Sequence, residues 1–105
     1  MRKMKSRLEY SGVQLDENYV LALNYLGQSL GYQARFQEAI NTFKKVLEID
    51  SNFKEAWNNL GVVFSSIKNI NDAINSFKKA LELDPNYKDA KKNLELIKNY
   101  KNKRV

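Results

Sequence analysis

The feature that most constrains the fold of this chain is a ten-residue phrase that recurs at an interval of 34 residues. It reads VQLDENYVLA at residues 13–22, LEIDSNFKEA at 47–56 and LELDPNYKDA at 81–90. Taken as whole units, residues 20–53 and 54–87 align without a gap and are identical at 14 of 34 positions. A fixed period of about 20 to 50 residues indicates a protein built by stacking copies of one supersecondary unit.

Each copy contains two stretches in which apolar residues fall at helical spacing. In residues 20–53 these are Leu23, Leu26 and Leu30, then Phe36, Ala39, Ile40, Phe43, Val46 and Leu47. In residues 54–87 they are Trp57, Leu60 and Phe64, then Ile70, Ala73, Ile74, Phe77, Ala80 and Leu81. The pattern predicts a pair of amphipathic helices in each copy and an all-α fold.

The ends of the second helix in residues 54–87 carry polar residues and a proline. Asn69 or Asn71 can cap its start, with Asp72 in the first turn. The pair Asp84-Pro85 ends it, because proline cannot continue the hydrogen-bond ladder. We therefore expect this helix to end just before Pro85.

Two glycines, Gly27 and Gly61, lie in the middle of the predicted first helices. Glycine costs about 1 kcal/mol relative to alanine in a helix interior, so a helix without close neighbours gains nothing from it. A tight crossing with the second helix of the same pair explains both positions, with the aromatic rings of Phe43 and Phe77 filling the volume beside it.

Residues 54–87 carry a signature that identifies a family. The signature residues are Trp57, Leu60, Gly61, Phe64, Ala73, Phe77, Ala80 and Pro85. Their order and spacing resemble the tetratricopeptide repeat, a helix-turn-helix unit of about 34 residues. Residues 20–53 depart from it at Leu23, Leu30, Val46 and Ser51, and three of these four are still apolar. The resemblance implies an α-solenoid of two such repeats.

The resemblance divides the chain into four segments. Residues 1–19 form a basic start and the remnant second helix of an upstream repeat, residues 20–53 the first repeat, and residues 54–87 the second. Residues 88–105 form a C-terminal capping helix and a basic tail. In the capping helix Ala90, Leu94 and Ile97 form an apolar stripe that can dock on the preceding repeat. The positions that a further helix would cover are polar: Lys91, Glu95 and Lys98.

Residues 1–19 allow two interpretations. Either the chain is the C-terminal piece of a longer array, or its first half-repeat is an N-terminal partial helix that covers Leu23 and Leu30. If neither covers this N-terminal face, an apolar surface stays open and a homodimer through it is expected.

Composition limits the chemistry. The chain has no histidine and no cysteine, so it lacks the commonest general base, the thiol nucleophile and the usual transition-metal ligands. Its carboxylates form no pair in an apolar setting, and its four glycines form no phosphate-binding loop. We therefore expect no enzyme activity, no cofactor and no metal. The chain has no apolar run long enough for a membrane span and no signal peptide, which favours a cytoplasmic protein without membrane insertion.

The net charge of +6 is concentrated at the two ends of the chain. Residues 1–7 carry +4 and residues 88–105 carry +5, which leaves −3 for the middle. Basic ends are more often solvated termini than a track for phosphates, so a nucleic-acid partner is not expected. The alternative is binding of nucleic acid or an acidic partner by the tail Lys98, Lys101, Lys103 and Arg104, with Tyr100 available for stacking.

In tetratricopeptide repeats the concave surface comes from the first helix of each pair, at five positions that helical spacing places on one face. The partner-binding candidates predicted here are Leu21, Asn24, Gln28, Glu55, Asn58, Asn59, Val62, Lys92, Asn93, Leu96 and Tyr100. Tyr25, Ser65, Asp89 and Asn99 belong to the same stripe. We expect Asn24 to pair with Asn58 and Asn59 with Asn93.

Asparagine amides offer donors and an acceptor, so they can bind the backbone of an extended peptide irrespective of its sequence. The other interpretation is that these asparagines are solvated polar residues in an asparagine-rich chain. Asp89 would repel a free carboxylate, so the resemblance does not extend to repeats that clamp the C terminus of chaperones. The predicted function is a non-enzymatic adaptor that receives a protein or peptide ligand in this groove, within a larger assembly. A self-associating structural spacer is a further alternative.

Overall fold

A computed structural model describes residues 17–103, which fold into five helices and no strand. The helices are α2 (Glu17–Tyr32), α3 (Phe36–Ile49), α4 (Lys54–Ser66), α5 (Ile70–Leu83) and α6 (Lys88–Lys103). This all-α arrangement of two helix pairs followed by one further helix confirms the predicted architecture. The upstream helix predicted within residues 1–19 lies outside the described residues, except that residues 17–19 form the first turn of α2. None of the described helices is long and apolar enough to cross a membrane.

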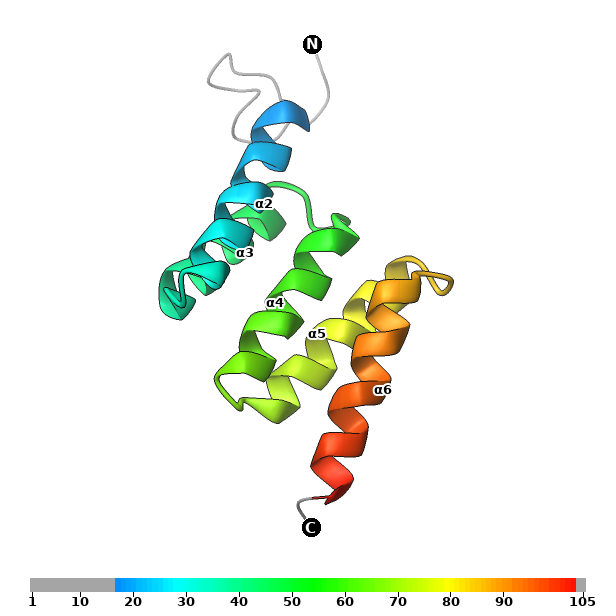
Figure 1. Cartoon of the computed structure of the whole chain (residues 1–105). Helices are drawn as coiled ribbons and strands as arrows, with labels where there is room; N and C mark the ends of the chain where they lie inside the picture. Colours follow the sequence, from blue (N-terminus) through cyan, green and yellow to red (C-terminus); the bar gives the residue numbers. More distant parts are fainter. Residues whose placement is uncertain (1–16, 104–105) are drawn as a thin grey trace.

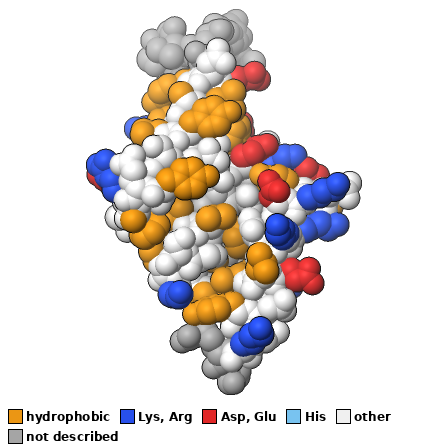
Figure 2. Space-filling view, viewed as in Figure 1, with side chains coloured by type: hydrophobic (Ala, Val, Ile, Leu, Met, Phe, Trp, Pro, Cys, Tyr) orange, Lys and Arg blue, Asp and Glu red, His pale blue; other side chains and the backbone are white. Residues whose placement is uncertain are grey.

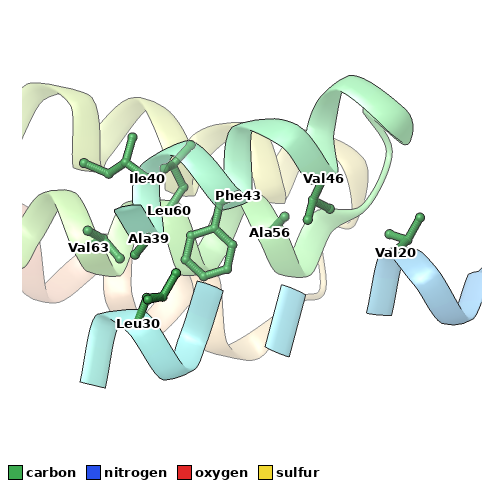
Figure 3. Close-up of a cluster of buried hydrophobic side chains, with 9 residues drawn as sticks. All are labelled: Val20, Leu30, Ala39, Ile40, Phe43, Val46, Ala56, Leu60 and Val63. Carbon is green, nitrogen blue, oxygen red and sulfur yellow. The ribbon is translucent and has the colours of Figure 1, made fainter. Parts of the chain in front are cut away.

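The helices form two layers. The first helices of the pairs, α2 and α4, lie side by side with α6 on one face of the molecule, and α3 and α5 lie behind them (Figure 1). The largest core cluster lies between the two layers of the first pair and continues into α4 (Figure 3). Its buried members are Val20, Leu30, Ala39, Ile40, Phe43, Val46, Ala56, Leu60 and Val63. A second cluster joins α5 to α6 through Ala73, Ile74, Phe77 and Ile97.

The turn inside each helix pair has the same geometry in both repeats. Ala34 and Lys68 occupy equivalent positions with φ angles of 62° and 64°, in the left-handed region. In the second repeat the backbone N–H of Asn69 then donates to the carbonyl of Phe64 at 2.8 Å. Asn69 is the N-cap residue of α5, as predicted, but its side chain makes no capping hydrogen bond, and the same holds for the expectation at Asn71. The Asn71 side chain instead accepts a hydrogen bond from Lys101 on α6.

The contact between a glycine and a phenylalanine ring sets the distance between the helices of each pair. A Cβ atom added to Gly61 would lie 2.5 Å from Cε1 of Phe77, and one added to Gly27 would lie 2.5 Å from the same atom of Phe43. Both rings are almost completely buried. The close crossing predicted from the two glycines is therefore confirmed, because any side chain there would overlap a ring that cannot move away.

Helix α6 packs against α5 through Ala90 and Ile97, which are buried. Lys91, Glu95 and Lys98 are exposed, as expected for a capping helix that presents a polar face. At the other end, the expectation that Leu23 and Leu30 need a cover is wrong for Leu30, which the described residues already bury. The exposed apolar side chains on α2 are Tyr19 and Leu26, among others.

Leu26 is equivalent to Leu60, and the physical reason for the difference lies there. Leu60 is buried against the core cluster of the preceding helix pair, while Leu26 has no preceding pair within the described residues. The surface that could face an upstream unit therefore centres on Tyr19 and Leu26. Association of two copies through this surface stays a prediction.

The glycine contacts generate a test with an internal control. We expect Gly61→Ala to destabilise the fold by about 1 to 3 kcal/mol, because the added methyl group overpacks against Phe77. A Cβ at Gly31 would meet only Cγ2 of Val63 at 3.7 Å, which is ordinary contact. Gly31→Ala should therefore stabilise the chain by up to about 1 kcal/mol through its better helix propensity. Urea unfolding followed by circular dichroism measures both, and equal effects of the two substitutions would contradict the assignment.

Candidate functional site

The face formed by α2, α4 and α6 is hollowed by three adjoining cavities. The first cavity lies between α2 and α4 and has a volume of about 310 Å³. The second cavity lies between α4 and α6, with about 350 Å³. The third, called here the acidic cavity, lies where α4 and α6 begin and has about 340 Å³. Figure 2 shows this face, with hydrophobic side chains along α2 and scattered across the hollows beside it.

The first and second cavities are copies of each other. Of the nine residues that line the second cavity, eight lie 34 positions after a residue of the first, and only Lys68 has no such counterpart. The phenylalanine rings of the glycine contacts, Phe43 and Phe77, reach the two cavities at equivalent positions. Val62 and Ser66 line both cavities, so the wall between the two hollows is a single turn of α4.

The acidic cavity adjoins the first cavity through Gln28 and Asn59, which line both. Its charged residues are Glu55 and Asp89, which occupy equivalent positions at the starts of α4 and α6. Neither forms an ion pair among residues 17–103. Burial raises the pKa of the nearby Tyr87 to about 12, and the negative charges of Glu55 and Asp89 add to the effect. Tyr87 therefore stays neutral and presents a hydroxyl group beside two carboxylates.

An ion pair holds this end of the face in place. The ammonium group of Lys54, at the start of α4, pairs with the carboxylate of Asp84, just after α5. The hydrogen bonds from Lys54 and from the backbone N–H of Asn86 lower the pKa of Asp84. The Lys54 ammonium also lies 4.9 Å from the centre of the Tyr87 ring. These contacts fix the turn that leads into α6 and hence the position of Tyr87.

The predicted asparagines form a ladder of hydrogen bonds between neighbouring helices. Asn59 donates from Nδ2 to Oδ1 of Asn24 at 3.1 Å, and Asn93 donates from Nδ2 to Oδ1 of Asn58 at 3.0 Å. The expected pairing of Asn24 with Asn58 and of Asn59 with Asn93 is therefore wrong. Equivalent side chains on parallel helices point in the same direction, so they cannot meet. The partner must be one residue further on, about 100° around the helix.

The asparagines of the ladder are not solvated surface residues. Asn24 is 4% exposed and Asn58 is 6% exposed, and Asn58 also hydrogen-bonds the side chain of Tyr87. Asn59 and Asn93 are half-buried and face the cavities. Asn24 and Asn58 therefore hold the three helices together, while the amides of Asn59 and Asn93 remain accessible to a ligand.

The ladder predicts a stability cost that a surface asparagine does not carry. Asn58→Ala removes the acceptor of Asn93 and the partner of Tyr87, so we expect a loss of about 1 to 3 kcal/mol in the free energy of unfolding. Asn99→Ala, at an exposed position on α6, should change it by less than about 0.5 kcal/mol. The two variants are compared in urea melts. Indistinguishable melts would show that the ladder does not hold the helices.

The tail residues are partly engaged in structural contacts. The Tyr100 ring lines the second cavity and lies under the ammonium group of Lys68, at 5.6 Å from the ring centre. Lys101 donates to Oδ1 of Asn71 at 3.0 Å. Both contacts pin the last turns of α6 onto the end of α4 and the start of α5. Arg104 lies outside the described residues.

Comparison with known families and structures places these features. The tetratricopeptide repeat family matches residues 20–53 and residues 55–87. The chain is a tetratricopeptide repeat protein. Among solved structures it is similar to YrrB, described as a TPR protein with an unusual peptide-binding site, with a TM-score of 0.68 and 28% sequence identity. The similarity covers 71% of this chain but 39% of that chain, so the match spans well under half of YrrB. Comparison with curated protein sequences gives no match.

The tetratricopeptide geometry brings most of the predicted groove residues together. Of the eleven candidates, only Lys92 lines none of the three cavities; the others are distributed over them. Among the further members of the stripe, Tyr25, Ser65 and Asp89 line cavities, and Asn99 does not. Across residues 17–103, no three acidic residues come close enough to hold a metal ion.

Sequence reasoning missed residues that are contributed by the turns and by the second helices. Phe53 and Tyr87 line the acidic cavity, and Phe43 and Phe77 form part of the other two. Phe53 and Tyr87 are aromatic, lie 34 residues apart and directly precede α4 and α6. That periodicity was the signal available in the sequence.

Proposed function

We propose that this chain is a non-enzymatic protein-interaction adaptor whose groove, formed by α2, α4 and α6, binds a segment of a protein partner. The observation that carries the proposal is the series of three adjoining cavities on the face that the core does not use. Cavities of this size with apolar walls and a few placed polar groups are the usual form of a ligand site. Tyr25, Val62 and Leu96 keep their apolar surface exposed along this groove.

The chemical inventory supports binding rather than catalysis. The chain contains neither histidine nor cysteine, and the two unpaired acids of the acidic cavity sit beside a neutral tyrosine. The similarity to YrrB also supports a peptide ligand, because that protein is described as having a peptide-binding site. A protein partner that presents a peptide to the groove accounts for these features together.

The proposal is tested by selecting short random peptides displayed on phage against the intact chain. Val62→Lys places a charge on the wall shared by the first and second cavities. Leu83→Lys is the matched control, because Leu83 is 39% exposed, close to the 43% of Val62, and lines none of the three groove cavities. We expect the enriched peptides to lose at least about tenfold in affinity for Val62→Lys and to bind Leu83→Lys like the parent chain.

Circular dichroism establishes that both variants are folded before binding is compared. Enriched peptides that bind Val62→Lys and the parent equally would contradict a ligand in this groove. A selection that enriches no peptide would also argue against it.

A further inference from the structure

The proposed groove carries a more specific pattern than an apolar surface, and this inference rests on the proposed function. The first and second cavities have equivalent linings, similar volumes and a common wall at Val62. A cavity of about 310 or 350 Å³ has room for one large apolar side chain such as leucine or phenylalanine. A ligand that fills both cavities therefore needs two such side chains, one on each side of Val62.

The distance between the two cavities follows from the asparagine ladder. Direct hydrogen bonds from Asn59 to Asn24 and from Asn93 to Asn58 require neighbouring helices to be in packing contact. Helices in contact have axes about 8 to 10 Å apart, so the equivalent cavities repeat at about that interval. A polyproline II backbone advances about 3.1 Å per residue with three residues per turn. Residues i and i+3 therefore project from the same side, about 9 Å apart.

Polar groups in the groove favour an extended backbone over a helix. The ladder uses Nδ2 of Asn59 and of Asn93, and their Oδ1 atoms accept no hydrogen bond from the described residues. The two carbonyl oxygens repeat at the same interval as the cavities. An extended peptide has free backbone N–H groups to donate to them, whereas the N–H groups inside a helix are already used.

Charge distinguishes the two ends of the groove. Glu55 and Asp89 of the acidic cavity adjoin the first cavity and form no ion pair within residues 17–103. At the opposite end, Lys68 lines the second cavity. A ligand residue beside the first cavity is therefore complementary to the groove when it is basic.

From these observations we propose that the groove recognises an extended segment of a partner protein with two large apolar residues separated by two others. Its end nearest the first cavity carries a lysine or arginine. The apolar side chains fill the first and second cavities, the backbone between them crosses Val62 and donates to Asn59 and Asn93, and the basic side chain reaches Glu55 and Asp89.

The test uses fluorescent, end-capped synthetic peptides with two leucines separated by one, two, three or four serines. Each is made with a lysine outside the first leucine or outside the second, because the direction of the chain in the groove is open to both. Fluorescence polarisation gives the affinity for the intact chain, for Val62→Lys and for the control Leu83→Lys. Peptides in which glutamate replaces the lysine measure the contribution of charge.

We expect the peptides with two serines to bind at least about tenfold more tightly than those with one or four, since a misplaced leucine stays in water. Replacing lysine by glutamate should weaken binding further, as should Val62→Lys, while Leu83→Lys has no effect. Binding that is lost in Val62→Lys but independent of the spacing would overturn the two-cavity pattern and leave the groove as the binding site. Binding that is unaffected by Val62→Lys would overturn both, and failure of every peptide to bind would overturn the pattern.

Discussion

The contact between Gly61 and the ring of Phe77, repeated at Gly27 and Phe43, is the constraint on which the rest of the structure depends. It brings the two helices of each pair closer than any side chain other than hydrogen would allow. The aromatic ring fills the space that the missing side chain leaves and is buried in doing so. Because the same ring also reaches the groove-side cavities, the contact that closes the core sets the depth of the groove.

The asparagine ladder is the second constraint, and it acts between pairs rather than within them. Hydrogen bonds from Asn59 to Asn24 and from Asn93 to Asn58 place α2, α4 and α6 at a regular interval. Each bond joins a buried asparagine to one that faces the groove. One residue type therefore serves both the stacking of the repeats and the polar floor of the candidate site, and an asparagine substitution meant to test binding also tests folding.

The sequence predicts those parts of the molecule that depend on period and on size. The interval of 34 residues predicts the helix pairs, and two glycines placed against two phenylalanines predict the crossing between them. It does not predict which side chains of neighbouring helices meet, because that depends on rotation about each helix axis. The asparagine pairs were therefore misplaced by one residue, and Leu30 was expected to need a cover that the first pair already provides. Phe53 and Tyr87 were missed because they lie in turns, outside the helical stripe that defined the search.

The account's central claim is that a partner segment lies across α2, α4 and α6 in extended form. A crystal structure of the intact chain with the tightest peptide from the selection tests it most directly. The account predicts one apolar side chain on each side of Val62 and backbone N–H groups donating to the side chains of Asn59 and Asn93. A peptide bound against α3 and α5, or bound as a helix, would contradict it.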